Sequence, residues 1–352
     1  MAVNCVDQLL FSDGKPLRLK IQDKDRLRVL YLAKHVKGDG EFHQTDGSHA
    51  KYHLEIKSCL KTLGLELNFA NSYEEIFARP NCNFIFTLFN RAQFRNSEIL
   101  ASCLGEYHRI PYLGSSPSMR GFGDDKHLSK IMFHSLGIPT PQWQVYRSNE
   151  LDFCPPLFEA DRYVVKPNNC SASWGVYHST SWKDLEPCVR QLLAANHDVI
   201  VEEYIPGVDV TVPVLGAGIP WILYPMANLS SDDLGIVSYG QKRGFDPGSS
   251  IQFFKDYEKH FELIEYTKKI NNMIWPFDYG RFDYRITPSG KIYAFEYNLS
   301  CNLGSNRAIC QSAKLLGYEQ VDLVESILAN SLERQRVQFE NVIENKEVFW
   351  EI

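Results

Sequence analysis

The chain has 352 residues, of which 44% are hydrophobic and 13% aromatic, so it can fill two or three packed cores and is not expected to be disordered. Its formal net charge is -6, which argues against a general nucleic-acid binder, and its nine cysteines lack a Cys-x-x-Cys pair and favour reduced thiols over a disulfide framework. Residues 1–15 do not read as a signal peptide, and no apolar run approaches a membrane span of about 18 residues, so we expect a cytoplasmic protein without membrane or nucleic-acid partners.

The first part of the chain alternates between predicted strands and helices. Two apolar runs predict strands and two stretches with helical spacing predict helices, in the order 26–32, 52–63, 83–88 and 97–108. The second of these segments is followed by Gly64, a residue type that commonly ends helices. Residues 35–50 are rich in Gly, His and Asp and are expected to form a loop. The alternation predicts an α/β domain with a mainly parallel sheet.

Two further units follow. The first is predicted to contain, in order, a helix, a strand, a helix and a strand at 124–136, 162–167, 182–195 and 198–205. The second is predicted to contain a polar loop, a helix and two strands at 229–244, 256–273, 279–286 and 291–299. A Pro-Ser-Gly turn separates the last two strands and predicts an antiparallel hairpin. The charged segment 336–352 is expected to be a peripheral tail.

The predicted hairpin carries polar side chains at intervals of two. Residues two apart on a strand point to the same face, so Arg281 shares a face with Asp283, and Glu296 shares one with Asn298. Their oxygen atoms are the hard ligands that magnesium bound to phosphates requires, and the arginine could stabilise developing negative charge. A cross-strand ladder of ion pairs fits the same residues equally well.

Several upstream residues could contact a nucleotide. Lys126, Lys166 and Lys242 lie where a phosphate could be reached, although each alone is typical of a surface lysine. Carboxylates near the end of the strand at 198–205 could accept hydrogen bonds from adenine or ribose. His43, His49 and His53 could be read as a zinc site, but no set of ligands accompanies them.

The order of these motifs resembles that of ATP-grasp ligases, and in particular of D-alanine–D-alanine ligases. The resemblance rests on the motifs DDK at 124–126, VVKP at 164–167, VEEYIPGVDVTV at 201–212 and RFDY…FEYN at 281–298, together with IPYLG and GIPTP between 110 and 141. The resemblance implies an α/β (α+β ATP-grasp) fold, with an N-terminal parallel-sheet domain followed by two α+β subdomains that sandwich ATP. The implied units are residues 1–118, 119–205 and 206–335, with the tail at 336–352.

The resemblance also implies roles for individual residues. The ATP contacts would come from Lys126, Lys166, Glu202, Glu203, Tyr204, Ile205, Asp209 and Lys242, the last on a mobile loop. Asp283, Glu296 and Asn298 would ligate magnesium, with two ions expected and manganese as an alternative. Arg281 would stabilise the tetrahedral intermediate formed when an amine attacks an acyl phosphate, and Lys242 would act with it in catalysis. The implied partners are a small carboxylate and an amine, and a homodimer is left open.

The substrate half of the implied site departs from the family. The family's serine in the turn after the phosphate lysine is replaced by Ala172, and the aromatic residue after the loop lysine by Arg243. In the motif Asn-x-x-Pro-Gly-x-x-x-x-Ser that begins at Asn298, the last three named positions are Cys301, Asn302 and Arg307. The candidate substrate contacts are therefore Ser171, Arg243, Asn302, Gly304, Ser305 and Arg307. The resemblance also places His43, His49 and His53 near the loop that faces substrate in the family, which favours a substrate contact over zinc for these histidines.

These departures predict a carboxylate–amine ligase of specialised metabolism rather than one that makes D-alanyl-D-alanine. Arg307 could bind a carboxylate that the reaction does not consume, or it could instead cap a helix or pair with Glu319. Two other functions stay open. One is an enzyme that phosphorylates a ketone or amide oxygen to give an imine or amidine, and the other is a non-catalytic, ATP-binding regulatory protein.

Overall fold

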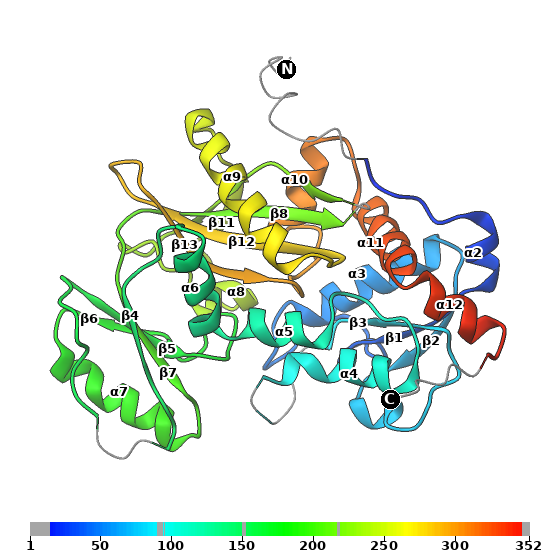
Figure 1. Ribbon diagram of the computed structural model, residues 1–352, viewed down its shortest axis with the longest axis horizontal. Coiled ribbons are helices and arrows are strands. Elements are labelled where there is room, and N and C mark those ends of the chain that lie inside the picture. Colours follow the sequence, from blue (N-terminus) through cyan, green and yellow to red (C-terminus); the bar gives the residue numbers. More distant parts are fainter. Residues whose placement is uncertain (1–14, 90–93, 95, 150–152, 217–218, 347–352) are drawn as a thin grey trace.

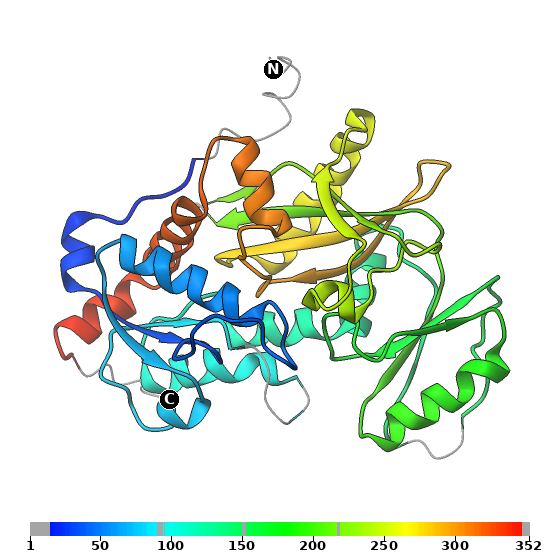
Figure 2. The same cartoon turned by 180° about the vertical axis from the view of Figure 1, so that it is seen from behind.

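The computed structural model describes residues 15–89, 94, 96–149, 153–216 and 219–346, and the expectations for residues 1–14 and 347–352 lie outside them. The described chain forms three sheets, and Figures 1 and 2 show them as separate layers with helices packed between and around them. Among these residues no helix combines the length and apolar character that a membrane crossing needs.

The first sheet has the order β2-β1-β3 and is parallel, as predicted. Its central strand β1 (Arg28–Leu32) is buried from its second residue on, because helices cover both faces of such a sheet. Its neighbours are β2 (Glu66–Ala70) and β3 (Phe84–Thr87). The helices of this region are α2 (Ile21–Arg26), α3 (His49–Thr62), η1 (Tyr73–Ile76), η2 (Ser97–Ile99) and α4 (Leu100–His108).

The second sheet is antiparallel, has the order β4-β7-β5-β6, and packs against α7 (Trp182–Ala194). Two helices lead into it, α5 (Pro117–Asp124) and α6 (Lys126–Ser135). The single helix predicted over 124–136 therefore begins later than expected, because Asp125 is extended and its side chain accepts a hydrogen bond from the Leu128 amide as an N-cap. The strands are β4 (Trp143–Tyr146), β5 (Tyr163–Pro167), β6 (Tyr177–Ser179) and β7 (Val199–Glu203).

The third sheet is also antiparallel, with the order β11-β10-β8-β12-β13 and β9 paired to β8. Helix α9 (Tyr257–Ile274) buries its apolar face against this sheet. The hairpin predicted from the sequence is present as β12 and β13. The strands are β8 (Val208–Gly216), β9 (Pro220–Ile222), β10 (Met226–Ser230), β11 (Ser249–Phe253), β12 (Tyr279–Ile286) and β13 (Ile292–Asn298), and the short helix α8 (Tyr239–Arg243) lies between β10 and β11.

The C-terminal helices join the first and third sheets. Helix α11 (Gln320–Arg334) packs against α3, and both contribute to one apolar core with residues of β1 and β12. It follows α10 (Ala308–Leu315) and precedes α12 (Arg336–Ile343). The prediction of a peripheral tail is wrong for the part of the tail that forms α12. Phe339 is fully buried in this core, and Arg336 donates two hydrogen bonds of 2.9 Å to Asp23.

Candidate active site between the second and third sheets

The second and third sheets enclose a cavity of about 240 Å³. Its lining combines Lys166 and Glu202 from the second sheet with Asp283 and Glu296 from the third, and Lys242 of α8 closes one side. All eight residues expected to contact ATP line this cavity: Lys126, Lys166, Glu202, Glu203, Tyr204, Ile205, Asp209 and Lys242. Three segments that are far apart in the sequence therefore present phosphate-binding and oxygen-donor side chains to one space.

The β12–β13 hairpin brings its four polar residues together on one face. Arg281 lies opposite Asn298 and Asp283 lies opposite Glu296, as the alternation of strand side chains predicts. The Arg281 Nε atom is 3.2 Å from Asp283 Oδ2, and the Thr211 hydroxyl donates a 2.7 Å hydrogen bond to Asp283 Oδ1. Immediately after these four residues the pairing of β12 with β13 shifts by one residue. The shift is a β-bulge, a feature that changes the direction of side chains and is common near functional sites.

The two opposing carboxylates have opposite pKa shifts. Burial, with a further contribution from the charge of Glu296, raises the pKa of Asp283. Burial also disfavours the charged form of Glu296, but Lys126, Lys166 and Lys242 outweigh it and lower the pKa of Glu296 to about 2. Asp283 and Glu296 line the cavity with hard oxygen donors of the kind that magnesium and manganese bind. Asn298, the third predicted metal ligand, lines the adjoining smaller cavity, and its Oδ1 atom accepts a 2.8 Å hydrogen bond from the Ser300 amide.

A buried lysine that the sequence did not single out lies beneath the cavity. The Lys130 Nζ atom is 3.1 Å from one Glu202 carboxylate oxygen, and the Lys166 Nζ atom is 2.6 Å from the other. Lys130 is fully buried, and burial lowers its pKa to about 8. Glu202, expected to contact adenine, therefore forms ion pairs with two lysines. The available signal was the spacing of Lys130 four residues after Lys126, which places both on one face of α6.

Most of the other residues predicted to contact ATP form hydrogen bonds with backbone groups or an ion pair with a neighbouring side chain. Glu203 accepts a 3.0 Å hydrogen bond from the Gln142 amide, and the Tyr204 hydroxyl donates one of 2.6 Å to the carbonyl of Leu234. Lys126 donates to the backbone carbonyl of Cys170. Asp209 Oδ1 is 3.5 Å from Arg285 Nε, and burial raises the pKa of Asp209 to about 6.

The segment expected to be a loop around Lys242 forms helix α8 at its C-terminal end. The helix occurs there because Ser238 and Gln241 make a reciprocal capping box. Two backbone carbonyls of this helix are bonded from other parts of the chain. The Ser48 amide donates 2.9 Å to the Arg243 carbonyl, and Arg307 donates 3.0 Å to the Lys242 carbonyl. Burial in the cleft lowers the pKa of Lys242.

An adjoining cavity of about 150 Å³ lies between α8, the hairpin and the start of α3. Four of the six predicted substrate residues line it: Ser171, Arg243, Asn302 and Arg307. Gly304 and Ser305 lie outside this lining. Their amides donate instead to Asn302 Oδ1 at 2.7 Å and to a carboxylate oxygen of Glu55 at 3.1 Å. His49 and His53, for which a substrate contact was expected, also line the cavity together with Asn298, whereas His43 does not.

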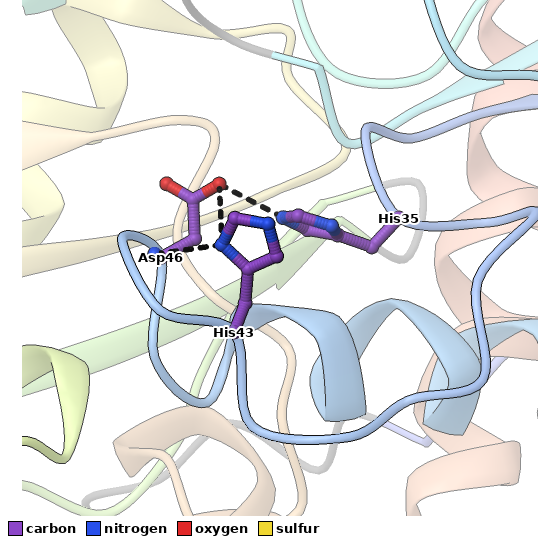
Figure 3. Close-up of side chains that lie close together, drawn as sticks. All are labelled: His35, His43 and Asp46. Carbon is purple, nitrogen blue, oxygen red and sulfur yellow. Dashed lines mark hydrogen bonds and ion pairs between the residues drawn. The ribbon is translucent and has the colours of Figure 1, made fainter.

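The loop before α3 contains a separate cluster of His35, His43 and Asp46 (Figure 3), whose ligand atoms lie within 4.8 Å of one another. His35 Nε2 is 2.8 Å from Asp46 Oδ2, which Lys34 also contacts. His43 Nδ1 accepts 3.2 Å hydrogen bonds from the amides of Thr45 and Asp46. With these atoms already engaged, the cluster orders the loop and does not fit a zinc site, and it includes neither His49 nor His53.

Comparisons with known proteins agree with this geometry. The family model described as "D-ala D-ala ligase C-terminus" matches residues 132–329. The chain is 30% identical over 222 residues to a D-alanine–D-alanine ligase of Aquifex aeolicus, covering 62% of this chain and 73% of that one. It is 28% identical over 308 residues to D-alanine–D-alanine ligase B of Pseudomonas putida, covering 81% and 91%. The fold is similar to that of D-alanine–D-alanine ligase from Bacillus anthracis solved with ATP, with a TM-score of 0.69 at 18% identity, covering 88% of this chain and 99% of that one.

Proposed function

The chain belongs to the D-alanine–D-alanine ligase family, and from this membership we propose that it is an ADP-forming ligase that joins a small carboxylic acid to the amino group of an amino acid. In this reaction ATP phosphorylates the acid to an acyl phosphate, and the amine then displaces phosphate to leave an amide. The observation that carries the proposal is the single cavity in which Lys126, Lys166 and Lys242 face Asp283 and Glu296.

Each part of the cavity has a role in this scheme. The lysines position the phosphate groups, and Arg281 stabilises the negative charge that develops when the amine attacks. Asp283, Glu296 and Asn298 would hold magnesium, which neutralises phosphate charge when bound. Lys242 and α8 close the cleft and exclude water, which would otherwise hydrolyse an acyl phosphate.

The substrate half of the site differs from the family pattern at the position expected to contact the amine substrate. Arg307 stands at the position of a family serine and lines the cavity next to the hairpin. A guanidinium can hold a carboxylate through two parallel hydrogen bonds, which a hydroxyl cannot do. We assign to Arg307 the carboxylate that the amino acid keeps, and we place the reaction in specialised metabolism rather than in the synthesis of D-alanyl-D-alanine.

The test is ADP formation across a panel of small acids and amino acids that includes D-alanine, with mass spectrometry of the products. We expect ADP only when an acid and an amine are both present, and we expect Glu296→Gln to abolish turnover because a metal ligand is lost. Lys268→Gln, on the exposed face of α9, is the control. ADP formed with D-alanine alone would contradict the specialised-substrate proposal.

The same assay separates the other candidate functions. When both carboxylate oxygens of the acid are labelled with heavy oxygen, a carboxylate ligase leaves one labelled oxygen in the amide and transfers the other to phosphate. An enzyme that activates a ketone or amide oxygen transfers its entire label to phosphate. A non-catalytic nucleotide-binding protein would bind ATP and form no ADP with any member of the panel.

A further inference from the structure

The smaller cavity carries an excess of positive charge. Its described lining contains five cationic side chains and no carboxylate, the cations being Arg120, Lys242, Arg243, Arg281 and Arg307. One of the five is paired with a carboxylate, since Arg281 contacts Asp283. Arg120 is 2% exposed and donates 2.6 Å to the carbonyl of Leu113. Lys242 is assigned to phosphate, which leaves Arg243 and Arg307 as the more accessible cations without a carboxylate within hydrogen-bond distance among the described residues.

Arg307 has a backbone partner but, among the described residues, no ion pair with a carboxylate. It donates 3.0 Å to the carbonyl of Lys242, which orients the guanidinium without neutralising it. Burial and the nearby charges of Arg281 and Arg243 lower the pKa of Arg307. Cations are therefore crowded together here, an arrangement that bound anionic groups would relieve.

Arg243 has only a distant and already occupied counterion. Its Nη1 atom is 3.9 Å from Asp46 Oδ1, which is too long for a hydrogen bond. The other oxygen of Asp46 contacts Lys34 and also His35, the latter shown in Figure 3, so the negative charge of Asp46 is shared among several groups. The Nε atom of Arg243 is buried and has no hydrogen-bond partner among the residues that the structure describes. A buried donor of this kind is costly unless a ligand satisfies it.

The start of α3 adds to the positive potential of the same cavity. Its first turn contains no acidic residue to offset the positive end of the helix dipole. His49 begins this helix and His53 follows one turn later, and both line the cavity. Burial, together with the charges of Arg243 and Arg307 in the case of His49, lowers the pKa of each histidine to about 3. Both are therefore neutral hydrogen-bonding groups beside two unmatched guanidinium groups.

We propose that the amino-acid substrate carries a second anionic group, which binds Arg243 beside the start of α3 while its main carboxylate binds Arg307. This inference rests on the proposed ligase function and names its substrate class, an acidic amino acid. The second group is a carboxylate or a phosphate, since both present oxygens that a guanidinium binds in pairs. An apolar side chain in its place would leave the Arg243 Nε donor unsatisfied, and a neutral polar side chain would leave the positive charge of Arg243 unmatched.

Calorimetric titration with matched amino acids tests the inference, in the presence of magnesium and a non-hydrolysable ATP analogue. The pairs are glutamate with glutamine, aspartate with asparagine, and phosphoserine with serine, and the first two differ mainly in charge. In at least one pair we expect the acidic member to bind about tenfold more tightly or better, as for one charge-assisted hydrogen bond. The carboxylate pairs and the phosphoserine pair distinguish the two kinds of anion.

Three variants locate the effect. Arg243→Gln should remove the preference for the acidic member, and Arg243→Lys should keep part of it because the charge remains. Arg307→Gln should weaken binding of both members of a pair. Arg190→Gln removes a cation from the exposed surface of α7 and serves as the control. Thermal denaturation of each variant checks that it is folded.

Several outcomes would overturn the inference: equal affinities within every pair, a preference that survives in Arg243→Gln, or no binding by any member. ADP formation, measured separately, distinguishes this failure from failure of the ligase proposal. Turnover with neutral amino acids only would leave the ligase standing and remove the second anion. If the acidic amino acids bound more tightly in an Arg243-dependent way but no combination of acid and amine gave ADP, the second anionic group would stand and the ligase proposal would fail.

Discussion

Glu202 lies between Lys130 and Lys166 and forms an ion pair with each of them. Of the two lysines, only Lys166 also lines the larger cavity. A buried carboxylate with two cationic partners can release one of them and remain neutralised by the other. Lys166 would then be free to turn toward a phosphate group while Lys130 keeps Glu202 ionised. Lys130 is thus a positioning residue, since it acts on ATP through Glu202.

Lys130→Met tests this division of roles. Methionine fills a similar unbranched space without the charge, so Lys166 becomes the only cation left to Glu202 and is held away from the phosphates. We expect the KM for ATP to rise about tenfold, equivalent to about 1.4 kcal/mol, while the KM for the amino acid stays unchanged. Lys268→Met, at an exposed pair with Glu265, is the control. An unchanged KM for ATP would show that Lys130 serves stability alone.

Individual site residues were predictable where local geometry decides their position. The two-residue period of strands is sufficient to place Arg281, Asp283, Glu296 and Asn298 on one face, and the register confirms it. Lys130 was not predictable in the same way, because the burial of a lysine depends on packing between α6 and a distant strand. The exclusion of Gly304 and Ser305 from the cavity lining likewise depends on contacts with α3 and within their own loop.

At the scale of elements, α8 is fastened to the loop that precedes α3. The Ser48 amide bonds to the Arg243 carbonyl, and Phe42 contacts Phe245 edge to face with 5.3 Å between ring centroids. Gly47 permits the close approach, because a Cβ atom there would lie 2.1 Å from the Arg243 carbonyl oxygen. The loop of the first domain therefore holds the helix that carries Lys242 over the cleft.

Gly47→Ala should detach α8 from this loop. The control is Gly64→Ala, since both glycines have positive φ values, +57° and +74°, but a Cβ atom at Gly64 meets nothing within 4 Å. Both variants should lose about 1 kcal/mol of stability from backbone strain. Only Gly47→Ala should make the segment around α8 more sensitive to protease when nucleotide is bound. Equal cleavage in the two variants would show that the loop does not hold α8.

Among the elements, sequence patterns located the long, strongly patterned segments and missed the weak ones. The apolar runs at β1 and β3 and the hairpin of β12 and β13 were predicted, whereas β2 was not. Its residues are mostly exposed or half-buried, so no apolar run marks this edge strand, and its pairing with β1 depends on the fold. Helix α8 was expected as a loop because its five residues are too few for a periodic pattern.

For the whole molecule, the C-terminal helix α11 unites regions that the sequence suggested as separate units. Asp278 lies fully buried just before β12, and Arg334 at the end of α11 donates to both of its oxygens, at 2.9 and 3.1 Å. Arg334 also donates to the carbonyls of Tyr112 and Gly114, where the chain leaves the first sheet. Local sequence patterns cannot predict a contact between residues so far apart in the chain.

Arg334→Leu should therefore destabilise the whole molecule rather than one part of it. Removing one partner of a buried ion pair leaves the Asp278 charge uncompensated, and we expect a loss of about 3–5 kcal/mol in the free energy of unfolding by denaturant titration. Adding Asp278→Asn should restore part of that loss, because the buried charge is then removed as well. Arg190→Leu, at an exposed pair on α7, should change stability by no more than about 0.5 kcal/mol. Since the first and third sheets share one core, circular dichroism and tryptophan fluorescence should report the same shifted transition. Two separate transitions in the wild type, with only one of them affected by Arg334→Leu, would refute this account of α11.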